Sequence, residues 1–417
     1  MFKTLLRRAV VGSALLGLSS AVYAFVIDPL VHTPANYNTF VPPPAGWTYT
    51  DPAFGTLVKR VSSAMTTSNN SGGGGMLEFI STEYSTMSPF NKDNTRFILQ
   101  HQGYFGLYDA AGIYLKDLPM AVNASSEPRW SRTSPSLLFY RNGGDLLKLD
   151  VNTNLTTLVR SFPYSTISGK GESDISFDGD HFVFAGDDRY VFVYQVSTNT
   201  KYPAFDTAGQ PFDSLYITPN NNVTITWLQA GTGLRQGIEL FNKNMVFQRQ
   251  VAHAGGHMDV SKDTNGDEIL LWTNSNDAQP IPNCDNGIVK IKLATAQQTC
   301  LLQLDWSIAV HISAPDGNGW VFVETYGGDP QPGSPDWKPY TNEILQVKLD
   351  GTQTRRLFHH RSRPSNDYGY MPRVSTNRAG TKLLYTSNYN LSSILGWPAD
   401  YTDVYMVNVP AGLSSSR

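Results

Sequence analysis

The chain has 417 residues, of which 40% are hydrophobic and only 16% charged, and it is rich in Gly (35), Pro (25), Tyr (21) and Phe (20). These residue types favour turns and strands over helices, so the composition predicts a globular all-β fold with a large core. With 32 basic and 35 acidic residues the formal charge is −3. This charge argues against binding to a nucleic-acid backbone, which requires a basic surface.

The first 24 residues resemble a signal peptide. Three basic residues precede an apolar stretch from Ala9 to Leu18, and Val22 and Ala24 supply small side chains for cleavage after residue 24. The apolar stretch is too short to span a membrane, and no other stretch is suited to do so. We therefore expect a secreted or periplasmic protein whose mature part has 29 basic and 35 acidic residues, a charge of −6.

One repeating pattern runs along most of the chain. Residues 128–131, 136–141, 145–150 and 156–162 read as four short strands separated by turns. Copies of this unit begin near residues 88, 128, 175, 215, 258, 312 and 372. Their spacing is typical of WD40-like, four-stranded blades, so the repeat predicts a seven-bladed β-propeller over residues 51–410.

The last unit has only three predicted strands, at residues 373–375, 382–387 and 403–409. Residues 55–61 resemble residues 351–357, the outer strand of the unit before it. We therefore expect the N-terminal strand to complete the last blade and close the ring, because closure removes an exposed edge. Residues 25–50 would form a lead-in segment and residues 411–417 a tail.

Two cysteines, Cys284 and Cys300, flank a predicted hairpin of residues 287–292 and 297–304. In an exported protein an even number of cysteines predicts a disulfide. Two free or metal-binding thiols are the alternative.

In a propeller, the segments that lead into the innermost strands meet on one face, and here they carry many reactive side chains. Five of the eight histidines lie in three consecutive segments of this kind: His253, His257, His311, His359 and His360. His257 and His311 hold equivalent positions in adjacent units, so their imidazoles should lie close together. Such a pair suits Zn²⁺ or Mn²⁺, or supplies a general base. The alternative is that these histidines only cap blades by hydrogen bonding to the backbone.

Charged residues and tyrosines accompany these histidines at the same face. Because Arg binds carboxylates bidentately, an acidic substrate group is the expected ligand. Tyrosine can stack on a sugar or share a proton. The candidate binding residues are Arg129, Glu172, Asp174, Arg361, Arg363 and Arg373, with Tyr370 as a candidate catalytic residue. The alternative for Arg129 and Arg373 is an ion pair with a blade carboxylate.

The stretch containing Asp263, Asn265 and Asp267 has the alternating oxygen ligands of a calcium loop. It lies between an inner strand and the next strand, where Asn-Gly is the expected hairpin turn. The turn is the favoured prediction.

The repeats resemble those of TolB-type propellers, and the histidines of the late units resemble the arrangement in oligogalacturonate lyases, which are seven-bladed. Ulvan lyases are similar propellers that use His, Tyr and Arg. The resemblance implies a metal on His257, His311 and His360 and β-elimination on an acidic oligo- or polysaccharide. A metal or Arg361 would neutralise the uronate carboxylate, and His257, His311 or Tyr370 would remove the proton beside it.

Two other functions are compatible with the sequence. A noncatalytic exported propeller would bind a glycan or protein partner, using exposed aromatic residues such as Tyr326, Trp337 and Tyr340. A glycosidic hydrolase would need two suitably spaced carboxylates, for which Glu127, Glu172 and Asp174 are available.

Overall fold

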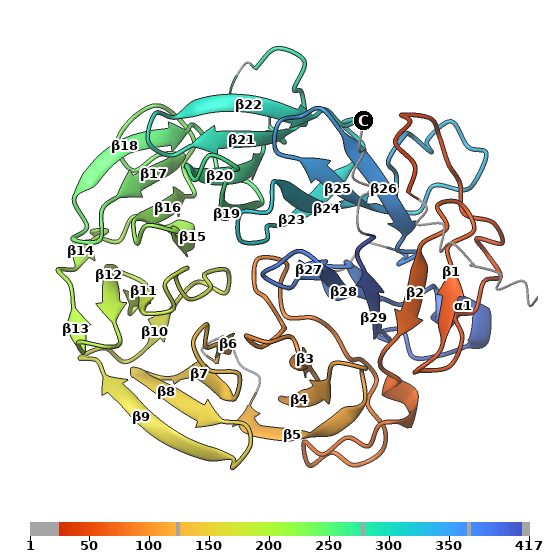
Figure 1. Ribbon diagram of the computed structural model, residues 1–417, viewed down its shortest axis with the longest axis horizontal. Helices are drawn as coiled ribbons and strands as arrows, with labels where there is room; N and C mark the ends of the chain where they lie inside the picture. Colours follow the sequence, from red (N-terminus) through yellow and green to blue (C-terminus); the bar gives the residue numbers. More distant parts are fainter. Residues whose placement is uncertain (1–24, 122–125, 277–278, 280, 365–367, 411–417) are drawn as a thin grey trace, which may run out of the picture.

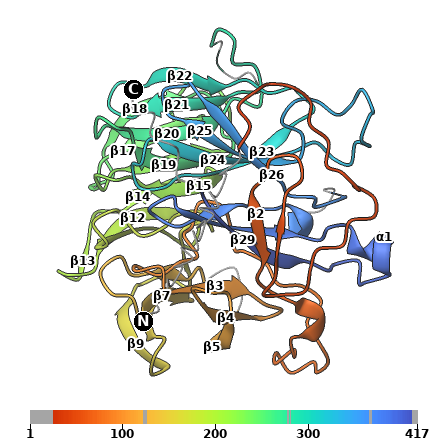
Figure 2. The same cartoon turned by 45° about the vertical axis from the view of Figure 1, so that its right-hand side comes forward.

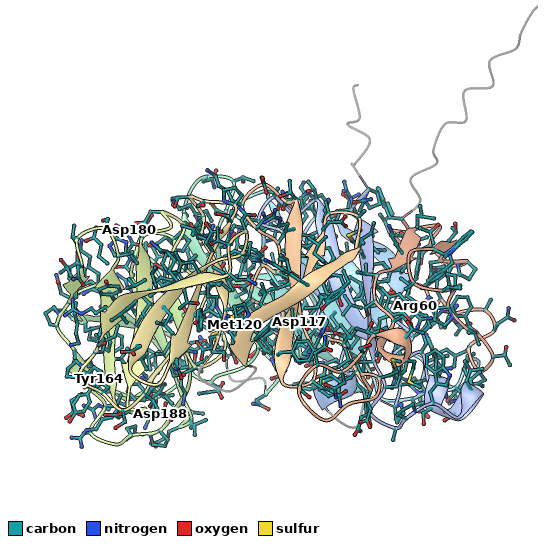
Figure 3. All side chains as sticks on the ribbon, turned by 90° about the horizontal axis from the view of Figure 1, so that it is seen from below. Arg60, Asp117, Met120, Tyr164, Asp180 and Asp188 are labelled. Atoms are coloured by element: carbon teal, nitrogen blue, oxygen red, sulfur yellow. A yellow bond between two sulfur atoms is a disulfide. The ribbon has the colours of Figure 1, made fainter. Side chains whose placement is uncertain are left out.

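The computed structural model describes residues 25–121, 126–276, 279, 281–364 and 368–410. In these residues seven antiparallel sheets stand around one axis in chain order, so the fold is a seven-bladed β-propeller (Figure 1). Figure 3 shows the same molecule from the side as a flat disc. The predictions of an all-β fold and of seven blades are confirmed. The predicted signal peptide (1–24) and tail (411–417) lie outside the described residues.

The first three blades follow the repeat along the chain. Blade 1 comprises β3 (Arg96–Gln100), β4 (Tyr104–Asp109) and β5 (Tyr114–Ala121). Blade 2 comprises β6 (Arg129–Trp130), β7 (Leu137–Asn142), β8 (Asp145–Asp150) and β9 (Leu155–Ser161). Blade 3 comprises β10 (Ile167–Ser168), β11 (His181–Gly186), β12 (Tyr190–Gln195), β13 (Thr200–Lys201) and β14 (Phe205–Asp206).

The remaining blades complete the ring. Blade 4 comprises β15 (Phe212–Ile217), β16 (Val223–Trp227), β17 (Ile238–Phe241) and β18 (Phe247–Ala252). Blade 5 comprises β19 (Met258–Lys262), β20 (Glu268–Thr273), β21 (Ile288–Lys292) and β22 (Gln297–Leu302). Blade 6 comprises β23 (Ala309–Ser313), β24 (Trp320–Tyr326), β25 (Glu343–Lys348) and β26 (Thr354–His359). Blade 7 orders β1 (Thr48–Thr50), β2 (Leu57–Arg60), β29 (Asp403–Asn408), β28 (Lys382–Ser387) and β27 (Ser375–Thr376).

In the described ranges short helices occur only in the connections between strands. They are η1 (Ala64–Thr66), η2 (Tyr368–Tyr370) and α1 (Leu391–Leu395). None of these reaches the length and apolar character needed to cross a bilayer.

Blade 1 differs from the predicted four-stranded unit. The innermost strand expected near Ser88 is reduced to an isolated bridge between Phe90 and Phe97. Proline has no N–H to donate, and Pro89 contributes only its carbonyl, which accepts a bond from Ile98 N at 3.1 Å.

The ring closes as the sequence predicts, through the N-terminal strand. β2 pairs antiparallel with β29, with Lys59 opposite Met406 and Arg60 opposite Tyr405. β1 then adds to β2 from within the lead-in segment, so blade 7 has five strands. Arg60, labelled in Figure 3, fixes this strand through an ion pair with the buried Asp403 at 2.6 Å.

Apolar side chains fill the space between neighbouring blades. Val183 and Val191 of blade 3, for example, share one buried cluster with Leu215 and Ile225 of blade 4. Every residue of β11 is buried, because a blade has a neighbour on each of its two faces. This explains why the strands read as nearly continuous apolar runs instead of alternating patterns.

Residues 25–47, which we call the N-terminal strap, cross the outer side of blades 6 and 7 (Figure 2). Val26 forms a bridge with Arg356 of β26, and the guanidinium of Arg356 donates to the Leu30 carbonyl at 2.5 Å. Trp337, on the long β24–β25 connection, donates from its indole N–H to the His32 carbonyl at 3.0 Å. The strap therefore covers Trp337 and the buried segment after β26.

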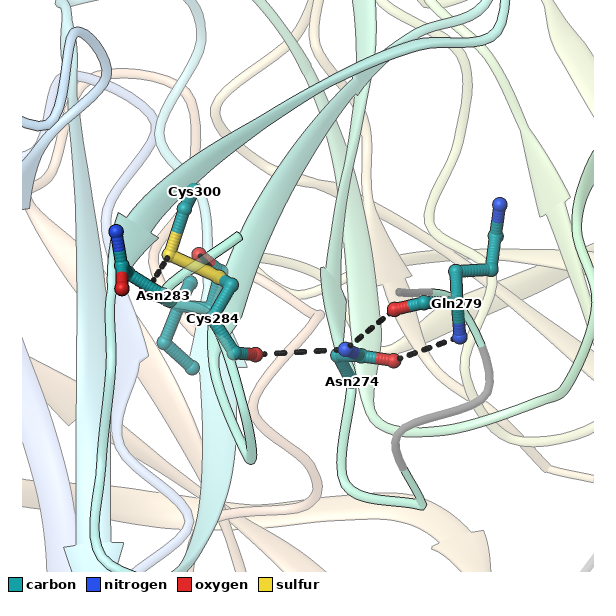
Figure 4. Close-up of a disulfide and its surroundings, with 6 residues drawn as sticks. Asn274, Gln279, Asn283, Cys284 and Cys300 are labelled. Atoms are coloured by element: carbon teal, nitrogen blue, oxygen red, sulfur yellow. Dashed lines mark hydrogen bonds between the residues drawn. A yellow bond between two sulfur atoms is a disulfide. The ribbon is translucent and has the colours of Figure 1, made fainter. Parts of the chain in front are cut away.

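The predicted disulfide between Cys284 and Cys300 is present and links the loop before β21 to β22 (Figure 4). Asn274 supports the same loop, because its side-chain amide donates to the carbonyls of Gln279 and Cys284 at 3.1 and 3.4 Å.

Candidate functional site

A chain of four polar side chains lies at the axis where blades 1, 5 and 6 meet. The hydroxyl of Tyr84 is 3.0 Å from Nδ1 of His257. The rings of His257 and His311 lie edge to face with centroids 4.4 Å apart. Nδ1 of His311 lies 3.1 Å from Oε1 of Glu324. The structure therefore brings together the two imidazoles that the sequence places at equivalent positions.

Backbone register accounts for this arrangement. His311 is the central residue of β23, and Glu324 faces it directly across the β23–β24 hairpin. His257 immediately precedes β19 in the adjacent blade. The backbone of Tyr84 is fixed by the Ser375 hydroxyl, which donates to the Tyr84 carbonyl at 2.8 Å. Blades 1, 5 and 6 thus contribute side chains to one point on the axis.

Burial controls the charge of this cluster. His311 and Glu324 are fully buried, whereas His257 is half-buried and is the imidazole nearer to solvent. Burial lowers the pKa of His257 to about 4, and His311 acts in the same direction. Burial acts to raise the pKa of Glu324, but His311, together with His360 and the backbone N–H of Val374, holds that pKa below its usual range. At neutral pH, His257 is therefore a neutral imidazole backed by an ionised carboxylate.

Two arginines border the cluster. Arg129 is buried and donates to Oε1 of Glu83 at 3.2 Å and to the carbonyl of Ser173 at 2.6 Å. Arg373 donates from Nη1 to the backbone carbonyl of Glu83 at 3.1 Å. The ion pair considered for Arg129 is thus present with Glu83, and Arg373 contacts the backbone of the same residue.

Glu172 approaches the axis from blade 3 and accepts a hydrogen bond from the buried Tyr216 hydroxyl. Burial raises the pKa of Glu172 to about 7, although the Tyr216 hydrogen bond acts in the opposite direction. A carboxyl that titrates near neutrality at the axis is able to exchange protons under ordinary conditions.

Asp174 lies farther along the axis and does not join the histidines. It pairs with Arg378 at 3.2 Å and with Arg132 at 3.6 Å, and Arg132 also pairs with Asp316. Together with Glu172 these residues line an axial cavity of about 30 Å³, space for a water molecule or two. The axial channel is therefore narrow at this end.

Among the remaining candidates near blade 7, Arg361 and Arg363 lie under the N-terminal strap, whereas His360 contacts the backbone of Thr325, next to Glu324. Arg361 donates to the Ala35 carbonyl at 3.0 Å, and Arg363 lies 3.7 Å from the centre of the Tyr37 ring. Nε2 of His360 is 3.0 Å from the Thr325 carbonyl, and its Nδ1 accepts a bond from Ser362 N at 3.0 Å. Both nitrogens of His360 are thus used by the backbone.

A larger cavity of about 390 Å³ lies between blades 7 and 1. Tyr370 and Arg373 line it, and the Tyr370 hydroxyl donates to Asp400 at 2.9 Å. The structure thus brings Tyr370 and Arg373 together at this cavity, while His257 and His311 stand at the axis.

The donor set at the axis does not match a zinc or manganese site. Nδ1 of His257 is engaged by Tyr84 and Nδ1 of His311 by Glu324, so neither of these two nitrogens is available to a metal ion. Within the described ranges no three His, Cys, Asp or Glu side chains are grouped to hold a metal ion. Protein sites for such metals usually supply three or more ligands, so two imidazole nitrogens alone do not fit.

The stretch considered as a calcium loop forms the turn between β19 and β20. Oδ1 of Asp263 accepts bonds from the backbone N–H groups of Asn265 and Asp267 at 2.9 and 3.1 Å. The Asp267 carboxylate pairs with Lys292 at 2.7 Å.

Sequence reasoning did not single out Glu324 or Tyr216. Glu324 lies on the second strand of its blade, whereas the search considered segments that lead into first strands. The signal that identifies it is the turn at Gly317 and Asn318, since a hairpin centred there places residue 324 opposite residue 311. The partnership of Tyr216 with Glu172 joins two blades, and no local pattern encodes it.

Comparison with known proteins identifies likenesses of structure only. No family model matches the sequence, and no curated protein matches it. An oligogalacturonate lyase in complex with manganese superposes with a TM-score of 0.61 at 13% identity, covering 89% of this chain and 97% of that one. An oligogalacturonate lyase from Vibrio parahaemolyticus gives a TM-score of 0.59 at 11% identity, covering 87% and 96%. The predicted resemblance to these propellers is confirmed at the level of the fold.

Proposed function

We propose that this chain is an exported lyase-like enzyme that cleaves a uronic-acid-containing glycan by β-elimination at the axial histidine cluster. The observation that carries the proposal is the half-buried, neutral His257, bonded to Tyr84 and packed on the His311–Glu324 pair. The fold likeness to oligogalacturonate lyases, at 13% and 11% identity, suggests the class of reaction. Fold alone does not give function, so the residues have to support the chemistry.

β-Elimination needs a base for the proton next to the carboxylate, a donor for the leaving oxygen, and a positive group for the developing charge. With Nδ1 of His257 protonated and donating to Tyr84, Nε2 is the atom that accepts the substrate proton. The C–H electrons then form the carbon–carbon double bond, and the bond to the glycosidic oxygen breaks. Tyr84 gives its hydroxyl proton to that oxygen and recovers one from Nδ1 of His257, so the protons balance.

The other groups orient the catalytic imidazole and stabilise the negative charge of the substrate. Glu324 holds the Nδ1–H tautomer of His311, whose ring supports that of His257. Arg373 donates to the carbonyl of Glu83, next to Tyr84, and its guanidinium is suited to the uronate carboxylate. Arg361, which the sequence suggests for this role, is held by the strap instead. No step passes through a metal, because the donor set does not fit one.

The experiment follows the ultraviolet absorbance of the unsaturated uronate while purified protein is incubated with a panel of polyuronates. Arms with added Mn²⁺ and with a chelator measure any effect of metal. His257→Ala should lower the rate by about 10²–10⁴-fold, the usual contribution of a general base. His253→Ala is the matched control, because His253 is a half-buried histidine four residues earlier whose backbone N–H and carbonyl, and not its ring, form hydrogen bonds with the described residues.

Absence of turnover on every polymer would overturn the proposal and favour a glycan- or protein-binding propeller. The structure weakens the form of that alternative suggested by the sequence. Trp337 is only 2% exposed and lies beneath the strap, and Tyr326 stacks on His311, so neither contributes to an open aromatic face.

A further inference from the structure

The cavity of about 390 Å³ is much larger than the axial one and falls in the range of small-molecule sites. Its lining comes from blade 1 and the segment before it (Phe79, Ser81 and Gln100) and from blade 7 and the segment leading into it (Tyr370, Arg373, Asp400 and Thr402); these two blades lie side by side in Figure 1. We infer that it is a binding subsite for a uronic acid residue of the glycan. The inference rests on the proposed function and adds to it the place and chemistry of sugar binding.

The wall of the cavity is a short segment that joins blade 7 to blade 1. Phe79 bridges in parallel to Thr402, and Ser81 bridges antiparallel to Gln100. Ile80 between them donates to the Thr402 carbonyl at 3.0 Å and accepts from the Thr402 hydroxyl at 3.1 Å. Because both blades hold this segment, the cavity is formed before a ligand arrives, which lowers the entropic cost of binding.

The lining has the chemistry that an acidic sugar requires. Arg373 lines the cavity, and a guanidinium group can bind a carboxylate through two parallel hydrogen bonds. Asp400 keeps acceptor positions for sugar hydroxyls beyond the one that Tyr370 fills. The side-chain amide of Gln100 makes no hydrogen bond to the described residues and can both donate and accept. Half-buried Phe79 supplies an apolar surface for a sugar ring.

The cavity is also close to the proposed reaction centre. From Phe79 the chain reaches Tyr84 in five residues, and Arg373 contacts the intervening Glu83 carbonyl. A glycan held in the cavity would therefore pass Tyr84 and reach His257. Arg373 would therefore contact the bound sugar where the glycan leaves the cavity and approaches Tyr84 and His257.

The test separates sugar binding from turnover. Calorimetry would measure binding of digalacturonic acid and of its dimethyl ester to the His257→Ala protein and to the same protein carrying Gln100→Ala or Arg373→Gln. Gln297→Ala and Arg249→Ala are matched controls, since both residues are exposed on outer strands far from the cavity in sequence and blade. Circular dichroism and melting temperature verify that each variant is folded.

We expect the acid to bind more tightly than the ester. Gln100→Ala should weaken binding of the acid about 3–10-fold, and Arg373→Gln should weaken it about 10–100-fold and abolish the preference over the ester. Equal binding of acid and ester, or no loss in Gln100→Ala, would overturn the subsite. If Gln100→Ala leaves both binding and KM unchanged while His257→Ala abolishes turnover, the subsite fails and the proposed function stands. If the acid binds with these losses but no glycan is cleaved, the subsite stands and the proposed function fails.

Discussion

The buried ion pair between Arg60 and Asp403 gives the sharpest test of how the ring closes. Asp403 is fully buried and accepts four bonds: Oδ1 from the Ser62 hydroxyl and Ala64 N, and Oδ2 from Arg60 and Tyr401. Three of these four donors belong to the N-terminal part of the chain. Asp403→Asn preserves the size of the side chain but replaces one acceptor oxygen with an NH₂ group, which would face other donors.

The expected loss follows from this geometry. Breaking a buried ion pair by removing one charge costs about 3–5 kcal/mol, because the remaining charge is left without compensation. We therefore expect the free energy of unfolding of Asp403→Asn to fall by about that amount. Lys59→Ala is the matched control on the same strand. The Lys59 ammonium donates to the Ala111 carbonyl at the surface, and its loss should cost less than about 1 kcal/mol.

Equilibrium unfolding in guanidinium chloride, followed by tryptophan fluorescence, measures both variants. Limited proteolysis then reports whether residues 48–64 become accessible before the rest of the chain. If Asp403→Asn were as stable as Lys59→Ala, within about 1 kcal/mol, the buried pair would not be what holds the closing strand.

Three further outcomes are expected. The Cys284→Ala/Cys300→Ala double variant should lose about 3 kcal/mol of stability in denaturant unfolding, because the bridge joins residues 16 apart, and reductant should not change the variant further. Since burial raises the pKa of Glu172 from 4.5 to about 7, the stability that its neutral form contributes is present below pH 4.5 and lost as the pH rises to about 7. Melting temperatures over this window should fall less in Glu172→Gln than in the wild type, and equal slopes would contradict the assignment. Arg356→Met leaves the buried Glu343 without its main partner and should lower the unfolding free energy by about 3–5 kcal/mol. A measured loss below about 1 kcal/mol would contradict this prediction.

Much of the fold follows from the sequence because a propeller repeats one local unit. Each hairpin turn and each apolar strand is encoded within a few residues, so the units could be recognised one at a time. The closing strand was predictable for a related reason: residues 55–61 look like an outer strand, and one unit lacked such a strand. Blade 1 departs from the prediction because Pro89 prevents regular pairing of its innermost strand.

The site is predictable only where it depends on the repeat. His257 and His311 meet because equivalent positions in adjacent blades face the same axis. Arg361 and Arg363 have equally suggestive sequence positions, but the strap covers them through contacts with Ala35 and Tyr37, more than 300 residues earlier in the chain. Such contacts are not part of the repeat, and no sequence pattern around residue 360 predicts them.

Closure of the ring and formation of the candidate site depend on the same seam between blades 7 and 1. The segment that bridges Thr402 to Gln100 leads within a few residues to Tyr84, whose hydroxyl contacts His257 on the opposite side of the axis. A shift of blade 7 against blade 1 would therefore change the width of the cavity and the position of Tyr84 together. Because β2 is joined to β29 inside blade 7 by hydrogen bonds and an ion pair and not by a covalent bond, the buried interactions around Asp403 stabilise the closed ring and the geometry of the site at once.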